Sequence, residues 1–321
     1  AEQLGCETYL LPSTLLSAEY NRVRKKIDVW YQYRRLCSPT AILKERQWES
    51  LASPFGRWFR KMRRWSTVVE ISIPGVITRL LRMEQELMQG EAAFIEAQAW
   101  LERLKPDAGF CLTPYHWEED AIMRAAAARH IPLAISILSF DNLTTRGWMS
   151  LNFDRYLVWN HYNRQELSRG YPGASLDKIT LVGPVQFDFY WDESCFWTEA
   201  EWRCQLGIPE EKTVLLYAGN IAAHVPHEPV LVQQIDEAIR CGDLPDSLLI
   251  LLRLHPMDSH QRWSSLLANS QNIILDGAFK SDTLHANSTN FRQNKQGFVG
   301  DDDVKKHAST LRYSQVHVNV C

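Results

Sequence analysis

The chain has 321 residues, of which 45% are hydrophobic and 23% are charged, and its formal net charge is −3. This composition is ordinary for a globular protein, and the length predicts about two domains. No apolar run in these 321 residues approaches the ~20 residues that a membrane-spanning helix needs.

The cysteines are scattered and odd in number, seven in all, with no Cys-x-x-Cys pair and no histidine at metal-ligand spacing. This usage is typical of a reducing compartment, so we expect buried thiols, no metal and a cytoplasmic protein. The N-terminus carries no export signal. It is typical of the end of a helix, and the last predicted strand, 316–320, has no helix after it. We therefore expect a fragment that lacks residues at both ends.

In chain order, the first third predicts a strand at 7–11, a basic, aromatic helical region at about 13–65, a strand at 67–73 and one long helix at 76–104. Strands and helices then alternate. The predicted strands are 108–112, 132–138, 155–159, 179–182, 214–218, 248–252, 272–275 and 316–320. The predicted helices are 120–129, 163–169, 199–206, 230–240, 260–268 and 301–313. This alternation predicts parallel βαβ units in an α/β protein.

Residues 22–64 form a basic segment, with thirteen Lys or Arg against three acidic residues. If the C-terminal end of this segment is helical, Trp58, Met62 and Trp65 share one face of the helix, and basic residues lie on both sides of that face. This pattern matches a helix lying on an anionic membrane surface, and it equally suits a helix that packs its tryptophans on its own domain and leaves its arginines in solvent. Nucleic acid also suits basic residues between aromatics, but without a recognisable binding module it is not an expected partner. The predicted membrane-surface residues are Trp58, Arg60, Lys61, Arg63 and Arg64.

Arg253 and His255 follow the apolar run 248–252, which is typical of a strand buried on both faces. Open α/β sheets bind ligands outside the carboxyl ends of their strands. Because Arg and His both donate hydrogen bonds to phosphate, we predict that this pair binds a nucleotide diphosphate. Gly219 and Asn220 follow strand 214–218, where free amides can bind an anion. The alternatives are a strand-end histidine bonded to a carbonyl and a plain tight turn.

Four local patterns, in order along the chain, carry a resemblance. They are Ser-Phe-Asp-Asn-Leu-Thr-Thr-Arg-Gly at 139–147, Val-Gly-Pro-Val-Gln-Phe-Asp at 182–188, Leu-Arg-Leu-His-Pro at 252–256 and Leu-Arg-Tyr-Ser-Gln-Val-His-Val-Asn at 311–319. Over roughly 105–320 the chain resembles two-domain GT-B glycosyltransferases near the CDP-glycerol glycerophosphotransferases and the UDP-N-acetylglucosamine 2-epimerase superfamily.

The resemblance implies two Rossmann-like, doubly wound parallel-sheet domains that face a cleft. Residues 1–183 would form the acceptor side, 184–212 the connection and 213–321 the nucleotide-donor domain. It also implies that His255 and Pro256 contact the donor's phosphate region. Members of the family usually place a Ser/Thr-rich turn and helix, which take part in donor binding, after the strand matching 316–320. The sequence stops at Cys321, so we expect this half of the donor site to be missing and such a fragment to be inactive.

The implied activity is metal-independent transfer of a glycosyl or glycerophosphoryl group from a nucleotide-activated donor, with no cofactor. The acceptor would be a surface polysaccharide or a lipid-linked saccharide, and a lipid-linked acceptor would bring the protein to the inner face of the plasma membrane. A sugar-nucleotide 2-epimerase is the alternative, although the Gly-Asp and Glu-Ala-Gly patterns of the resembled epimerases are missing after strands 108–112 and 132–138. A noncatalytic sugar-binding protein also stays open.

An inverting transferase needs a base to take a proton from the acceptor hydroxyl. Asp141 follows strand 132–138 and is the first prediction for this base, with capping of a turn as the alternative. His116, after strand 108–112, is the second. Asn142 and His224 are predicted acceptor or loop contacts, and for His224 the alternative is a solvated loop.

Overall fold

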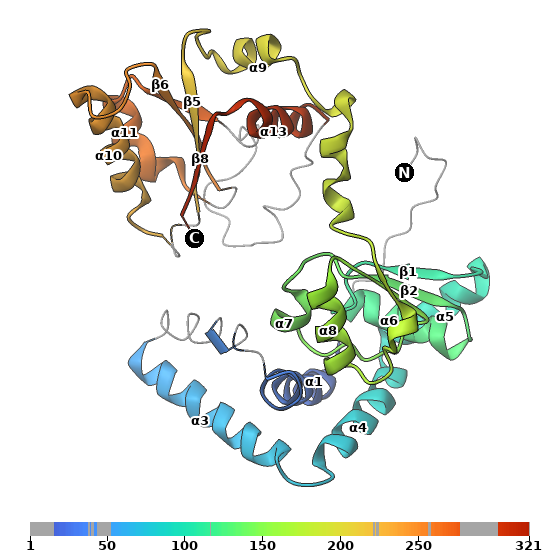
Figure 1. The fold of residues 1–321 in the computed structure, drawn as a ribbon. Coiled ribbons are helices and arrows are strands. Elements are labelled where there is room, and N and C mark those ends of the chain that lie inside the picture. Colours follow the sequence, from blue (N-terminus) through green and yellow to red (C-terminus); the bar gives the residue numbers. More distant parts are fainter. Residues whose placement is uncertain are drawn as a thin grey trace. The chain divides into compact units, whose positions relative to one another are not determined.

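The computed structural model describes residues 16–37, 39, 42–43, 53–115, 117–220, 222, 225–255, 258–276 and 301–320. The chain divides into two compact units, Ala1–Gln186 and Phe187–Cys321. Each unit is built on a four-stranded parallel sheet flanked by helices (Figure 1). The predicted α/β class with two Rossmann-like sheets is therefore confirmed.

Helices lie ahead of the sheet in the unit Ala1–Gln186. They are α1 (Ala18–Trp30), continued by a π-helical turn at Tyr31–Arg35, α3 (Pro54–Ile71), α4 (Val76–Gly90) and α5 (Ala92–Leu104). Serine side chains cap two of them, because Ser17 accepts a hydrogen bond from the amide of Tyr20 and Ser53 accepts one from the amide of Gly56. α1 packs on α4, and α5 packs on α6 (Trp117–Ala128) of the same unit.

Two predictions in this region are wrong. The predicted strand at 67–73 belongs largely to α3, in which Ile71 packs against Val23 and Ile27 of α1 while Val69 stays exposed. Packing of one helical face has overridden the β propensity of this valine-rich stretch. The single helix predicted at 76–104 is broken at Glu91, whose backbone is extended. Its carboxylate there accepts a hydrogen bond from the Ser17 amide, at 2.9 Å.

The sheet of this unit has the order β1-β2-β3-β4, with all neighbours parallel. Its core includes Ile135, Tyr156, Val158 and Leu167, and Tyr31 from the helical segment packs into it. The strands are β1 (Gly109–Cys111), β2 (Leu133–Ser136), β3 (Arg155–Val158) and β4 (Ile179–Leu181). The connecting helices are α6 (Trp117–Ala128), α7 (Asn142–Thr145) and α8 (His161–Gly170), with a 3-10 turn at Leu176–Lys178.

The unit Phe187–Cys321 has the strand order β7-β6-β5-β8, again all parallel. β6 and β8 lie on opposite sides of β5, so the strand order reverses between β5 and β8. The strands are β5 (Thr213–Ala218), β6 (Leu248–Arg253), β7 (Ile273–Asp276) and β8 (Val316–Asn319). The helices are α9 (Glu199–Leu206), α10 (Glu228–Cys241), α11 (Ser264–Asn269) and α13 (Asp301–Tyr313), with 3-10 segments at Val185–Trp191, Glu193–Cys195 and His260–Trp263.

Alternate residues of β5 serve two cores. Leu215 and Tyr217 pack with Val232 of α10 and with Trp263, whereas Leu216 packs on the other face against Trp202 of α9. In β6, all five residues of the run 248–252 are buried. The prediction of a strand covered on both faces is therefore confirmed, and such a strand can present chemistry only beyond its ends.

Candidate functional site

The carboxyl end of β5 is held against both of its neighbours. The amide of Gly219 donates to the carbonyl of Arg253 at 2.8 Å, and a Cβ at Gly219 would lie 3.3 Å from that oxygen. Asn220 Nδ2 donates to the carbonyl of Val320, beyond β8, at 3.1 Å. A side chain at this position would therefore crowd the end of β6, and Asn220 bridges the point where the strand order reverses.

The amide of Asn220 already binds a carboxylate. It donates to Oε1 of Glu228 at 2.9 Å and to Oε2 at 3.1 Å. Glu228 opens α10, is fully buried and also lies 3.1 Å from Nη2 of Arg262. The Asn220 amide, which the sequence predicted to be free for an anion, thus donates to a carboxylate of the protein itself, and donor binding by Gly219 and Asn220 stays a prediction.

Arg253, at the last position of β6, forms an ion pair. Its Nη1 lies 2.7 Å from Oδ2 of Asp276, at the end of β7, and Nζ of Lys306 lies 2.5 Å from Oδ1 of the same carboxylate. Asp276 is fully buried, whereas the Arg253 side chain keeps 17% exposure. Two cationic side chains thus contact the same buried carboxylate at the carboxyl edge of the sheet.

Histidines flank this basic group. His255 follows β6 by two residues and is half-buried. The pKa of His307, on α13, lies below its ordinary value. Burial and the nearby charge of Arg253 both disfavour the imidazolium form, and the opposing effect of Asp276 is smaller. His307 is therefore predominantly neutral at neutral pH. Two residues predicted nearby, Pro256 and His224, lie outside the described residues.

In the other unit, Asp141 closes a turn. Its Oδ1 accepts a hydrogen bond from Ser139 Oγ at 2.5 Å, and its Oδ2 accepts one from Thr145 Oγ1 at 3.1 Å. Asp141 directly precedes α7, and Asn142 is the first residue of that helix. These contacts are those of a turn-capping residue, and the role of Asp141 as a base stays a prediction. The second predicted base, His116, lies outside the described residues.

Tyr115, in the loop after β1, was not predicted as a site residue. Its hydroxyl is buried and makes no hydrogen bond to the described part of the chain. Burial holds the pKa of this phenol well above its usual range, and nearby Tyr31 adds to that effect. Residue spacing along the sequence does not predict that a single tyrosine hydroxyl will be buried without a hydrogen bond, so this feature is seen only in the tertiary structure.

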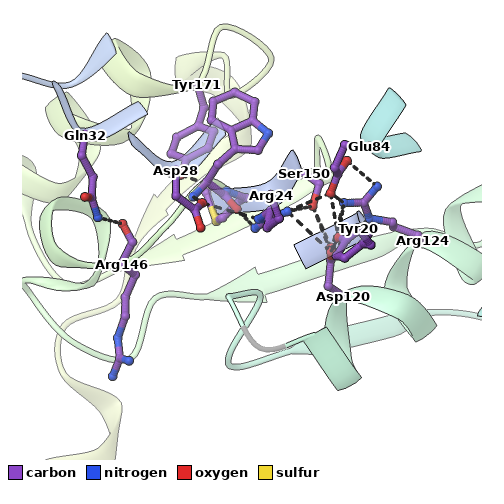
Figure 2. A network of polar contacts seen from close by, with 12 residues as sticks. Tyr20, Arg24, Asp28, Gln32, Glu84, Asp120, Arg124, Arg146, Ser150 and Tyr171 are labelled. Carbon is purple, nitrogen blue, oxygen red and sulfur yellow. Dashed lines mark hydrogen bonds and ion pairs between the residues drawn. The ribbon is translucent and has the colours of Figure 1, made fainter. Parts of the chain in front are cut away.

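A buried network of charges joins the helices ahead of the sheet (Figure 2). Arg24 Nη1 lies 3.0 Å from Oε1 of Glu84, and Arg124 pairs with Glu84 and, at 3.0 Å, with Asp120. The network consists of Tyr20, Arg24, Glu84, Asp120, Arg124 and Ser150. Its two guanidinium groups face Glu84 and Asp120, and Arg24 also pairs with Asp28 at 3.4 Å. Every guanidinium in the network therefore has carboxylate partners, and the network joins α1, α4 and α6 rather than offering a binding group.

The predicted membrane-surface residues all lie on α3. The alternative was a helix that packs its tryptophans on its own domain. Trp58 is 56% exposed, so its ring is not packed in that way. Arg60, Arg63 and Arg64 line a hollow shared with α1, and Lys61 lies outside that lining. Among the described residues, no helix is both long and apolar enough to cross a membrane.

No protein-family model matches the sequence, and no curated protein matches it either. Among solved structures, the chain is similar to UDP-GlcNAc 2-epimerase from Neisseria meningitidis bound to UDP-GlcNAc, with 16% identity and a TM-score of 0.37. It is also similar to UDP-GlcNAc 2-epimerase from Methanocaldococcus jannaschii, with 19% identity and a TM-score of 0.42.

The Neisseria alignment covers 61% of this chain and 54% of the epimerase, and the Methanocaldococcus alignment covers 60% and 55%. This chain therefore spans about half the length of either enzyme. Similarity at these TM-scores carries no argument about activity. The two parallel α/β sheets described above establish the architecture of this chain.

Proposed function

We propose that the protein binds a nucleotide-activated donor and transfers its glycosyl, or glycerophosphoryl, group to an acceptor hydroxyl. The observation that carries this proposal is the strand order β7-β6-β5-β8, which reverses between β5 and β8. Parallel α/β sheets bind nucleotides at the carboxyl ends of the strands beside such a reversal. Asn220, Arg253 and His255 lie at that edge of the sheet.

The donor phosphates are proposed to lie beside Arg253 and His255 rather than on the Asn220 amide. Glu228 occupies that amide and would repel a phosphate placed there. Arg253 contacts Asp276 through Nη1, and the remaining N–H groups of its guanidinium are the proposed donors to the diphosphate. A ring nitrogen of His255 is a further possible donor of a hydrogen bond.

In a glycosyl transfer, the acceptor oxygen forms a bond to the anomeric carbon. The bond from that carbon to the diphosphate breaks, and its electron pair leaves with the diphosphate. The acceptor proton passes to a base, for which we propose Asp141, with His116 as the second candidate. Positive charge at Arg253 stabilises the leaving group. The acceptor, a surface polysaccharide or a lipid-linked saccharide, belongs to the same proposal.

The donor proposal is tested by calorimetric titration of the protein with UDP-GlcNAc and with UDP-, CDP- and GDP-linked compounds of other sugars and of glycerol. His255→Gln is expected to weaken binding about tenfold, the value of one charge-assisted hydrogen bond. His260→Gln, an exposed histidine in the same unit, is the matched control. Absence of binding for every nucleotide would show that this edge of the sheet is not a donor site.

A second measurement separates transfer from 2-epimerisation. Epimerisation removes and replaces the proton on C2 of the sugar, so in heavy water it introduces deuterium at that carbon without an acceptor. Transfer instead releases nucleotide in proportion to the acceptor consumed. Asp141→Asn is expected to lower the transfer rate at least a hundredfold while donor affinity stays unchanged. An unchanged rate would remove Asp141 from the mechanism.

A further inference from the structure

α3 presents an apolar stripe to solvent. Of its 18 residues only Ile71, the last, is buried. The stripe consists of Phe55, Trp58, Met62, Trp65 and Val69, which are exposed by 74%, 56%, 50%, 70% and 61%. These positions recur at intervals of three and four residues and therefore lie on one face of the helix. An exposed apolar surface of this extent marks an interaction site rather than an ordinary solvated helix.

A basic hollow of about 1040 Å³ lies between α1 and α3. Six basic and two acidic side chains line it. The basic ones are Arg22, Lys25, Lys26, Arg60, Arg63 and Arg64, and the acidic ones are Asp28 and Glu70. The hollow is therefore a strongly cationic concavity.

The two carboxylates of the hollow are already engaged. Glu70 pairs with Lys26 at 2.6 Å. Asp28 lies 3.4 Å from Arg24 and accepts a hydrogen bond from the backbone amide of Trp148. Across the described part of the chain, no ion pair forms on four of the basic side chains, namely Arg22, Lys25, Arg60 and Arg63. Among the described residues of this unit, no acidic side chain compensates their charge, which points to an anionic partner.

The apolar stripe and the basic side of α3 adjoin. Successive residues of a helix are about 100° apart, so Phe59, one turn before Arg63, stands between the stripe and the hollow. A soluble anion would use the hollow but not the stripe, and an apolar protein groove would use the stripe but not the hollow. The boundary of a bilayer that carries anionic headgroups offers apolar and phosphate groups side by side.

We propose that α3 and the hollow that it forms with α1 dock on a bilayer containing anionic phospholipid. The aromatic side chains of the stripe enter the interface between headgroups and acyl chains, where tryptophan is enriched in membrane proteins. The arginines and lysines of the hollow contact the headgroup phosphates. This proposal does not depend on the transfer reaction, which the donor titrations test separately.

The test is flotation of the full chain with vesicles of phosphatidylcholine alone and with vesicles in which phosphatidylglycerol replaces part of it. We expect binding to the second kind only, and we expect salt to weaken it. Inositol hexakisphosphate in the absence of vesicles serves as the soluble phosphate, and a single-stranded oligonucleotide serves as the nucleic acid.

Two pairs of variants make the test specific. Arg60→Gln with Arg63→Gln is expected to weaken vesicle binding about 25-fold, or about fivefold for each lost charge. Arg82→Gln with Arg103→Gln removes the same charge from exposed positions on α4 and α5 and is expected to leave binding nearly unchanged. Trp65→Ala is expected to weaken binding about tenfold, whereas Trp191→Ala, at a tryptophan 89% exposed in the other unit, is not.

The three α3 side chains changed here, Arg60, Arg63 and Trp65, are exposed, so circular dichroism should show an unchanged fold for these variants. The proposal is overturned if the protein ignores anionic vesicles, binds both kinds of vesicle equally, or binds them equally well when α3 is altered. It is also overturned if the soluble phosphate or the oligonucleotide binds through Arg60 and Arg63 while vesicles do not.

Discussion

Glu228 lies with its carboxylate 2.9 Å from the backbone nitrogen of Asn220, so the protein supplies its own anion where the strand order of its second sheet reverses. The carboxylate is fully buried and also faces Arg262, which in turn lies 3.1 Å from Asp258. This arrangement fixes the turn after β5 and shifts the proposed phosphate position toward Arg253.

Replacement of Glu228 by Ala is expected to lower the free energy of unfolding of this unit by about 3 kcal/mol, because the Asn220 amide and part of Arg262 lose a buried partner. Glu237→Ala is the matched control on the same helix. Glu237 is 46% exposed, so its removal should cost less than about 1 kcal/mol. Urea unfolding followed by circular dichroism measures both changes. Equal losses of unfolding free energy in the two variants would show that the buried contacts of Glu228 contribute no more stability than the exposed Glu237.

Gly219→Ala is expected to lower the free energy of unfolding by about 1–3 kcal/mol, because the added Cβ would crowd the Arg253 carbonyl from 3.3 Å away. The same change should weaken nucleotide binding, since it displaces the end of β6 that carries His255. Gly90→Ala, at the end of α4, has no atom within 4 Å of the added carbon and is expected to be neutral or stabilising. Thermal unfolding with and without UDP-GlcNAc gives both quantities.

Glu84→Gln is expected to cost about 3–5 kcal/mol at neutral pH, because Arg124 and Arg24 would lose a buried carboxylate. Burial alone would raise the pKa of Glu84, but Arg124 and Arg24 together hold it below the ordinary value of 4.5. A carboxylate with a lowered folded-state pKa stabilises the fold above its unfolded pKa. That stability is lost as the pH falls through the folded-state pKa.

Wild-type stability should therefore fall on acidification below about pH 4.5, and the Glu84→Gln variant should lose less over the same range. Glu86→Gln, at an exposed position half a turn further along α4, serves as the control and should follow the wild type. Unfolding by urea at neutral and at acidic pH measures the difference. Parallel pH profiles for the wild type and Glu84→Gln would contradict the assignment.

His307 predicts a second pH dependence, in the other unit. Burial and the charge of Arg253 lower the pKa of His307 below its ordinary value of 6.5, so the unfolded chain binds a proton more readily than the folded one. Stability is then fully present above pH 6.5 and declines as the pH falls toward the folded-state pKa. His307→Gln should flatten this decline, and the exposed His260→Gln should not. Nuclear magnetic resonance titration of the ring protons measures the pKa directly.

Much of the fold was predictable because hydrophobic patterning is local. The run 248–252 carries its own evidence of burial on both faces, and β1 to β8 each fall within or beside a predicted range. The stretch at 67–73 was not predictable in this way. Its valines and isoleucine suit a strand, and only the contact of Ile71 with Val23 and Ile27 makes the helical form the better one.

For the candidate site, the sequence by itself determined which residues stand at the carboxyl ends of β5 and β6, because a strand's end is a property of the local pattern. Partners depend on distant segments. Only the tertiary structure decided that Arg253 pairs with Asp276 and that Asn220 binds Glu228, and only it decided that the tryptophans of α3 face solvent. Burial and ion pairing arise between elements, so no spacing along the chain could reveal them.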